Sequence, residues 1–159
     1  MFLFINTAEN KKLTVALVCS PSLRGRTPSP TRRTDEAISS EEKDKIFVET
    51  HLGRKIQILD KIILKINQNH SEELLPAVEK ILKRNKIALK DLAGVGVAAG
   101  PGSFTGVRVG VAAANALGFA LDIPVIGIKC EKGKNLIKEV FRNFEAGKFS
   151  RPAMPVYKI

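Results

Sequence analysis

The stretch 97–128, VAAGPGSFTGVRVGVAAANALGFALDIPVIGI, constrains the possible fold more than any other part of the sequence. It contains a small-residue strand, a Gly-Pro-Gly turn, a nearly uncharged helix over 104–121 and a second apolar strand. Asp122 and Pro124 end the helix, because proline cannot continue it. Strands that are apolar throughout are typical of parallel strands buried on both faces. The stretch therefore predicts a strand–helix–strand unit in an α/β domain, with parallel strands joined by a right-handed crossover.

The predicted helix carries a stripe of small residues. Gly106, Gly110, Ala114 and Gly118 recur at every fourth position. Each glycine inside a helix costs about 1 kcal/mol relative to alanine, so a neighbour must pack very close to this backbone. The sequence leaves two neighbours open, namely the protein's own sheet or helix and a partner chain. Asn115 is a polar residue in this apolar helix, and a buried amide needs hydrogen-bond partners.

The loop before the helix has the glycines of a phosphate-binding turn without the rest of its pattern. Such turns bind phosphate through free backbone amides at a helix N-terminus. A Walker A loop requires lysine after its second glycine, and Gly106 has none. A dinucleotide fingerprint fails at Thr105, and Pro101 lacks an amide donor. Two interpretations remain: Ser103 or Thr105 caps the helix, or a weak anion site forms from Ser103, Thr105 and Arg108.

The first part of the chain predicts further strands. Two β-rich runs at 2–6 and 13–19, separated by a polar turn, predict a hairpin. Strand-like apolar runs follow at 45–49 and 55–66. The segment 20–45 is rich in Ser, Pro, Thr and charge and has few large apolar residues, so we expect a surface loop or disordered insertion there.

Two amphipathic helices complete the predicted order of elements. The first, over 69–86, has Ser71 as its candidate N-cap and Pro76 as a residue that shifts its start or bends it. The second, over 135–148, ends at Gly147. The predicted apolar faces are Leu74, Leu75, Val78, Ile81 and Leu82 in the first helix, and Leu136, Ile137, Val140, Phe141 and Phe144 in the second.

Composition limits the class of protein. A chain of 159 residues with 44% hydrophobic and 26% charged residues suits one domain with its own core. The sequence has no run of about 18 apolar residues, so we expect no transmembrane helix. Its opening residues do not resemble a secretory signal. Cys19 and Cys130 match no metal spacing and adjoin apolar runs, so we expect buried, reduced thiols in a cytoplasmic protein.

The net charge of +10 is unevenly distributed, and most of the excess lies in 20–70 and 129–159. Such a charge attracts RNA or an acidic protein. The alternative is that the lysines only keep a small domain in solution. No aromatic residues interleave with the basic ones, as a base-stacking surface would require.

The sequence contains no recognisable catalytic set. His51 and His70 have no carboxylates arranged around them, and no His-x-x-x-His pair exists. His70 precedes a helix, where we expect it to be solvated or to cap. Ser103 lacks the Gly-x-Ser-x-Gly context of a nucleophile elbow. We therefore predict no catalytic and no metal-binding residue.

The segment 69–128 closely resembles the TsaB (YeaZ) family of bacterial tRNA threonylcarbamoyladenosine biosynthesis proteins. The run Gly-Pro-Gly-Ser-Phe-Thr-Gly-x-Arg-x-Gly at 100–110 carries most of this resemblance. The two opening strands match more faintly, and the segment 154–159, MPVYKI, is similar to the family's closing Pro-x-Tyr segment. The resemblance implies an actin/hexokinase-like ATPase (ribonuclease H-like) fold, with a mixed sheet and flanking helices, in a single N-terminal-type domain.

The resemblance also implies a function. Members of this family are non-catalytic scaffolds that pair with a TsaD-like enzyme, which transfers threonylcarbamoyl from its adenylate to the adenosine beside the tRNA anticodon. ATP and threonylcarbamoyl-adenylate are then used by partner subunits, including a TsaE-like ATPase, and no cofactor is assigned to this chain. A homodimer is a second possible assembly, tRNA contact is indirect or weak, and no membrane is involved. The helices matching 71–85 and 104–121 would contact the partner through Leu74, Leu75, Val78, Leu82, Gly106, Val107, Gly110, Val111, Ala114 and Gly118.

Three departures from the family pattern limit what can be carried over. Relatives usually begin Ile-Asp-Thr-Ser, whereas this chain has Asn6 in place of the aspartate that lies near a nucleotide's metal. The stretch 20–55 is longer than the family's connection, and most of the second domain is missing. We therefore divide the chain into an N-terminal-type domain over 1–130, with a basic Ser/Pro-rich insertion at about 20–55, and a helix and short tail over 131–159.

Two other classes of function stay open. One is a nucleotide-dependent transferase or peptidase, which the lack of a nucleophile–base pair disfavours. The other is a basic tRNA-binding module that uses the lysine-rich tail and the arginines of the insertion, Arg24, Arg26, Arg32 and Arg33.

Overall fold

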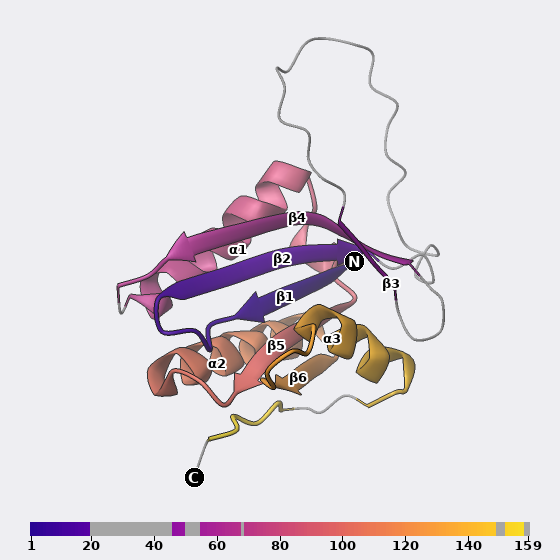
Figure 1. The fold of residues 1–159 in the computed structure, drawn as a ribbon. Coiled ribbons are helices and arrows are strands. Elements are labelled where there is room, and N and C mark those ends of the chain that lie inside the picture. Colours follow the sequence, from indigo (N-terminus) through magenta and orange to yellow (C-terminus); the bar gives the residue numbers. More distant parts are fainter. Residues whose placement is uncertain (20–45, 50–54, 68, 149–151, 158–159) are drawn as a thin grey trace.

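The computed structural model describes residues 1–19, 46–49, 55–67, 69–148 and 152–157. Over these residues, six strands form one sheet in the order β3-β4-β2-β1-β5-β6 (Figure 1). The predicted insertion at 20–45 and His51 lie outside the described residues. The elements are β1 Phe2–Asn6, β2 Lys12–Cys19, β3 Ile46–Glu49, β4 Lys55–Lys65, α1 His70–Asn85, η2 Leu89–Asp91, β5 Gly94–Gly100, α2 Phe104–Leu121, β6 Val125–Lys129 and α3 Leu136–Glu145.

Strand β1 makes the sheet mixed. It pairs antiparallel with β2, where Phe2 lies opposite Val18, and parallel with β5, where Phe2 lies opposite Gly94. Strand β4 pairs antiparallel with both β2 and β3, and β5 pairs parallel with β6. The predicted hairpin, the two strands after it and the parallel pair are therefore confirmed, as is the mixed α/β class.

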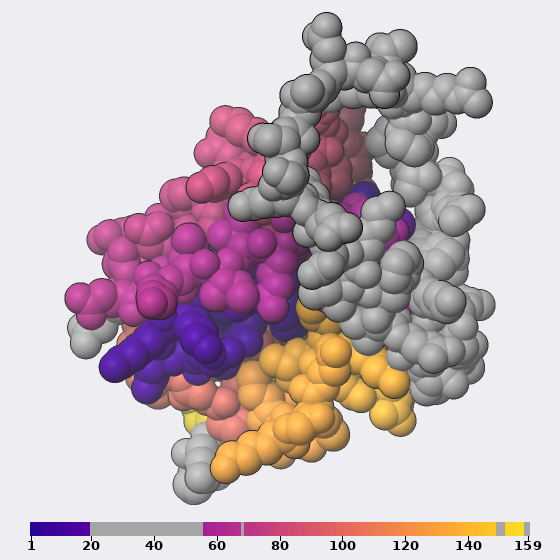
Figure 2. Space-filling model, turned by 45° about the horizontal axis from the view of Figure 1, so that its top comes forward, coloured from indigo at the N-terminus to yellow at the C-terminus, as the bar shows by residue number. Residues whose placement is uncertain are grey.

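The two faces of the sheet are covered by different helices. Leu3 and Ile5 of β1 join the core cluster that contains the buried side chains of α1 and α2. Phe2 and Phe4, which alternate with them, join the cluster that contains α3. The ring centroid of Phe2 lies 4.9 Å from that of Phe141 in α3. Figure 2 shows α3, in orange, beside the indigo hairpin strands.

Helix α1 begins two residues earlier than the predicted cap allows. Asn69 holds the N-cap position, and its carbonyl accepts hydrogen bonds from the amides of Glu72 and Glu73. Ser71 lies exposed in the first turn, so its prediction as the cap is wrong. The reason is His70, whose side chain is buried with Nε2 3.3 Å from the carbonyl oxygen of Glu9. His70 is therefore neither solvated nor a cap, and its burial fixes where the helix starts.

The apolar face of α1 differs from the prediction at one position. Four of the five predicted side chains are buried, but Leu75 is 56% exposed and the prediction for it is wrong. Ala77 is buried in its place. Residues three and four apart share a helix face, and Ala77 lies three after Leu74 and four before Ile81, whereas Leu75 is turned away. The helix continues through Pro76 to Asn85.

Helix α2 has the predicted bounds. The Ser103 side chain caps it by accepting a hydrogen bond from the amide of Gly106 at 3.3 Å. Asp122 ends it in the left-handed conformation, with φ 52°. Of the described helices, α2 alone is long and apolar enough to cross a membrane by length and composition, although no such helix was expected from the sequence. A helix packed on a sheet passes the same test, and α2 packs on β5, β1 and β6.

Two further predictions concern α3 and the two cysteines. Asn135 caps α3 by accepting a hydrogen bond from the amide of Lys138 at 3.2 Å, and Gly147 follows the helix with φ 65°. Cys19 and Cys130 form no disulfide, but each is only partly buried, so the expectation of buried thiols is wrong in degree. Burial raises the pKa of the Cys130 thiol above its ordinary value.

Candidate protein-binding surface on helices α1 and α2

The small-residue stripe of α2 faces the protein's own core. A Cβ atom on Gly106 would lie 2.1 Å from the carbonyl oxygen of Thr7, and one on Gly110 would lie 2.1 Å from Thr7 Oγ1. A Cβ atom on Gly118 would lie 2.2 Å from a methyl group of Val125. Of the two neighbours that the sequence left open, the structure places the protein's own strands against this backbone.

This packing corrects most of the contact residues that the resemblance implied. A side chain that is buried within the folded chain cannot contact a partner. Leu75 alone among the implied residues is exposed, at 56%. The implied residues that are buried in the chain's own core are Leu74, Val78, Leu82, Gly106, Val107, Gly110, Val111, Ala114 and Gly118.

The opposite side of α2 is apolar and exposed. Ala112, Ala116 and Ala120 are exposed at every fourth position, and Phe119 is 92% exposed. Arg108 is the single charged side chain of the helix. A helix surface with a single charge is unusual next to water, and small side chains allow another helix to approach closely. We call Ala112, Ala116, Ala120 and Phe119 the outer face of α2.

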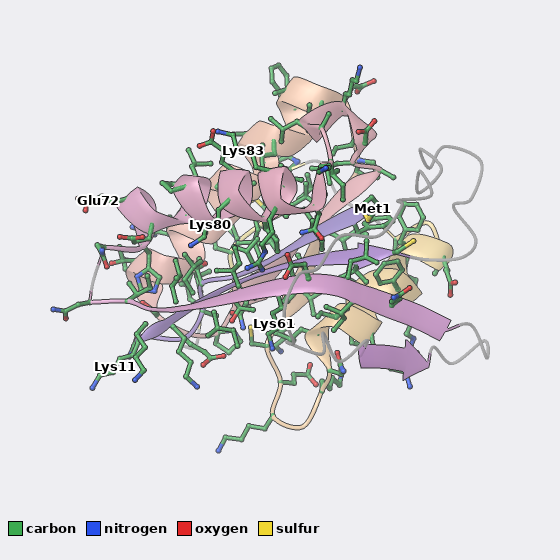
Figure 3. The ribbon with its side chains drawn as sticks, turned by 90° about the horizontal axis from the view of Figure 1, so that it is seen from above. Met1, Lys11, Lys61, Glu72, Lys80 and Lys83 are labelled. Atoms are coloured by element: carbon green, nitrogen blue, oxygen red, sulfur yellow. The ribbon has the colours of Figure 1, made fainter. Side chains whose placement is uncertain are left out.

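A groove lies beside α2, along α1. Its volume is about 530 Å³. Leu75 and Leu89, which are 56% and 45% exposed, contribute apolar side chains, and Leu117 belongs to α2. The ion pair between Lys83 Nζ and Glu79 Oε1, at 2.5 Å, lies on the α1 side of this groove. Figure 3 labels Lys83 with Glu72 and Lys80 along α1.

A second hollow, of about 570 Å³, lies where the N-terminal ends of α1 and α2 meet the β1–β2 turn. Ser103 and Thr105 line it together with Lys11 and His70. Arg108 does not, so the three candidate anion ligands are not brought together. Two amides of this loop and helix start are engaged within the chain, because the amide of Ser103 donates to the carbonyl oxygen of Ala8 at 2.7 Å and that of Gly106 donates to the Ser103 hydroxyl at 3.3 Å.

Asn6 stabilises the β1–β2 turn through its side chain. Its Oδ1 accepts a hydrogen bond from the amide of Ala8 at 3.0 Å, and its Nδ2 lies 3.5 Å from Glu9 Oε1. The Asn6 side chain therefore stabilises the β1–β2 turn. Within the described part of the chain, no group of three His, Cys, Asp or Glu side chains could hold a metal ion.

Arg108 belongs instead to an aromatic cluster that the sequence did not predict. Its guanidinium carbon lies 3.8 Å from the centroid of the Phe104 ring, and its Nε donates to the hydroxyl of Tyr157 at 3.0 Å. Tyr157 stands in the segment that resembles the family's closing Pro-x-Tyr. That likeness was the available signal, but nothing in it named Arg108 as the partner.

The sheet order and the division of helices between its faces define an α/β domain of the actin/hexokinase-like (ribonuclease H-like) class. The TM-score against YeaZ from Pseudomonas aeruginosa is 0.52 at 24% identity, over 80% of this chain and 43% of that chain. A family model described as "TsaD: tRNA N6-adenosine threonylcarbamoyltransferase" matches residues 57–134.

Sequence comparison finds the same relatives. The chain is 40% identical to the tRNA threonylcarbamoyladenosine biosynthesis protein TsaB of Bacillus subtilis over 77 residues, which is 48% of this chain and 34% of that protein. It is 38% identical to TsaB of Escherichia coli over 61 residues, 38% of this chain and 26% of that protein. The matches thus span about a third or less of these curated relatives. These findings confirm the predicted resemblance of this part of the chain to TsaB (YeaZ) proteins.

Proposed function

We propose that this chain is a non-catalytic subunit that pairs with a TsaD-like threonylcarbamoyltransferase in tRNA threonylcarbamoyladenosine formation. The observation that carries the proposal is the outer face of α2 with the groove beside it, an exposed apolar surface that includes Phe119 at 92% exposure. Contiguous exposed apolar surface is characteristic of protein interaction sites. The names of the relatives supply the pathway.

The contact surface in this proposal differs from the one that the sequence suggested. The glycine stripe holds α2 on the sheet, and the alanine side of the same helix meets the partner. Two helices that meet across alanine can bring their backbones close, which increases the number of van der Waals contacts. Leu75 and Leu89 then enter the interface from the groove.

The chemistry in this proposal stays with the partner. The engaged amide of Ser103 and the turn-closing role of Asn6 both disfavour phosphate binding by this chain. ATP and threonylcarbamoyl-adenylate would accordingly be bound by other subunits, and the complex would work in the cytoplasm, where tRNA is modified.

The test is a binding titration of the purified chain against the TsaD-like protein of the same organism, followed by threonylcarbamoyl transfer to tRNA. Ala116→Glu places a charge on the outer face of α2. We expect it to weaken pairing at least tenfold, which corresponds to about 1.4 kcal/mol, because the carboxylate would be buried without a partner. Transfer should fall in parallel.

Ala146→Glu is the matched control, because Ala146 is exposed after α3, which covers the other face of the sheet. It should pair like the parent chain. Equal pairing by Ala116→Glu, with the fold intact by circular dichroism, would contradict the proposed surface. Transfer that proceeds equally well without this chain would contradict the proposed role. Sedimentation of the chain alone shows whether a second copy occupies the same face.

A further inference from the structure

Residues 152–157 lie as a strap across α2 and the end of β5. The Asn115 side chain makes two hydrogen bonds to this strap. Its Nδ2 donates to the carbonyl oxygen of Ala153 at 3.0 Å, and its Oδ1 accepts from the amide of Ala153 at 2.8 Å. The amide of Val156 donates to the carbonyl oxygen of Ala99 at 2.7 Å. Ala153 is 1% exposed. The polar residue in the middle of α2 therefore finds its partners in the strap.

The sheet has glycines where the strap crosses it. A Cβ atom on Gly127 of β6 would lie 3.3 Å from the Cβ atom of Ala153. A Cβ atom on Gly100 would lie 2.4 Å from the carbonyl oxygen of Val156, and Gly100 itself has φ 94°. Larger side chains at these two positions would occupy the space that the strap fills. Residues of β5, β6 and α2 together therefore form the site in which the strap lies.

The far end of the strap fixes Arg108. The Tyr157 hydroxyl accepts the Nε hydrogen of Arg108, and the guanidinium lies over the Phe104 ring. The rings of Phe104 and Tyr157 have centroids 5.3 Å apart and are 57% and 41% exposed by residue. An arginine held in one conformation before binding loses less entropy when a partner binds. Aromatic residues and arginine also dominate the binding energy of protein interfaces.

We infer that the strap completes the partner-binding surface by holding Arg108 ready for a carboxylate on an apolar partner helix. The inference rests on the proposed function, because it concerns the same surface of α2. Arg108 is the single charge of the helix and, among the described residues, takes part in no salt bridge. The neighbouring positions toward the C-terminus of α2 are alanines rather than basic residues, which favours a protein partner over a nucleic acid.

Gly127→Val tests the strap without changing the outer face of α2. The added methyl groups should push Ala153 away, so hydrogen exchange at the amides of Ala153 and Val156 should speed up at least tenfold. The affinity for the TsaD-like protein should fall at least tenfold in the same sample. Ile128→Val, a conservative change that faces α3 from the same strand, is the control and should change neither measurement.

Two further variants keep the test decisive if Gly127→Val folds poorly. Asn115→Ala removes both hydrogen bonds to Ala153 and should reproduce the faster exchange and the weaker pairing. Tyr157→Phe keeps the ring but removes the acceptor for Arg108, and should weaken pairing about twofold to fivefold. Pairing should depend less steeply on salt concentration in Arg108→Leu, since the carboxylate contact is screened by salt.

The outcomes separate the inference from the proposed function. Faster exchange with unchanged pairing would overturn the inference, while a strong effect of Ala116→Glu would leave the proposed function standing. Unchanged exchange in both Gly127→Val and Asn115→Ala would overturn the docked strap itself. Loss of tRNA affinity with pairing unchanged would overturn it in favour of a nucleic-acid surface. No effect from Ala116→Glu on pairing would remove the proposed surface, and the inference with it.

Discussion

Helices α1 and α2 pack on the same face of the sheet, yet they present different surfaces to solvent (Figure 1). Along α1, exposed charged side chains run from Glu72 in the first turn to Lys83 in the last (Figure 3). Along α2, five of the seven exposed residues are alanine or phenylalanine, and Arg108 is the only charge. The exposed side of α1 is charged and suited to water, whereas α2 exposes an apolar side to solvent.

The difference shows how burial is encoded in each helix. In α1, the contrast between apolar and charged residues identifies the buried side, apart from Leu75. In α2, both sides are apolar, so hydrophobicity does not distinguish them. The glycines do, because all three face the protein's own core, whereas Ala112, Ala116 and Ala120 face outward. Substitutions on the two sides of each helix can therefore break or sharpen this comparison.

The largest expected effect is on the glycine side of α2. Gly110→Leu should lower the free energy of unfolding by about 3 kcal/mol or more, because Thr7 leaves no room for a side chain. Leucine improves helix propensity by about 1 kcal/mol over glycine, which is too little to offset the clash. Ala112→Leu, on the outer face, should leave stability within about 0.5 kcal/mol. Urea denaturation of both variants measures this, and equal stabilities would refute the inward orientation of the stripe.

Alanine substitutions of two adjacent leucines in α1 should differ nearly as strongly in their effect on stability. Leu74 is 1% exposed and Leu75 is 56% exposed. Leu74→Ala should cost about 3 kcal/mol, because it leaves a cavity in the core, whereas Leu75→Ala should cost less than about 0.5 kcal/mol. The binding experiment should reverse the order, with Leu75→Ala weakening pairing more. A large loss of stability in Leu75→Ala would show that the face of α1 is assigned incorrectly.

The next effect depends on pH and concerns Asp60 of β4, which binds Arg84 and Asn85 of α1. Burial disfavours the charged form of Asp60, but hydrogen bonds from Arg84, Asn85 and the amide of Lys61 outweigh it, so the pKa of Asp60 lies below its ordinary value of 3.8. A lowered pKa in the folded state gives stability that is present above the unfolded pKa and lost as pH falls through the folded one.

Asp60→Asn should therefore cost about 1.5 kcal/mol at neutral pH, as expected for loss of a charge-assisted hydrogen bond. The difference between parent and variant should shrink below about pH 4. Thermal unfolding from pH 7 to pH 2.5 measures it. A difference that stays constant down to the lowest pH would rule out the carboxylate as its source.

The smallest expected effect concerns serine residues at the N-terminal ends of α1 and α2. Ser103→Ala removes the side-chain cap of α2 and should lower stability by about 1 kcal/mol. Ser71→Ala should be neutral or slightly stabilising, by a few tenths of a kcal/mol, because Ser71 lies inside the first turn of α1 and alanine is the better helix former. Paired denaturation curves resolve both, and a similar loss in the two variants would restore Ser71 as a cap.

Much of the fold could be predicted from local sequence. The bounds of α2 follow from Ser103 before it and from Asp122 and Pro124 after it, and the structure has the same bounds. The hairpin follows from two β-rich runs around a polar turn. The start of α1 could not be predicted in this way, because His70 is drawn into the helix by a contact with Glu9, far from it in the sequence.

The candidate surface was predicted only in part. The comparisons support the family resemblance, and both helices carry exposed apolar side chains. The contact residues that the resemblance implied lie, except for Leu75, on the buried sides of these helices. The loop before α2 was predicted to cap or to bind an anion, and the structure shows the cap at Ser103. Arg108 was grouped with that loop, although its side chain is engaged by Phe104 and Tyr157.

The sequence by itself determined that something must approach the backbone of α2 at Gly110 and that Asn115 must find a partner. Both demands are local, because helix propensity and the cost of an unpaired amide depend on the residue and its immediate neighbours. Only the tertiary structure decided that Thr7 meets the glycine and that Ala153 meets the amide. Those pairings join segments far apart in the chain, and packing rather than any local pattern selects them.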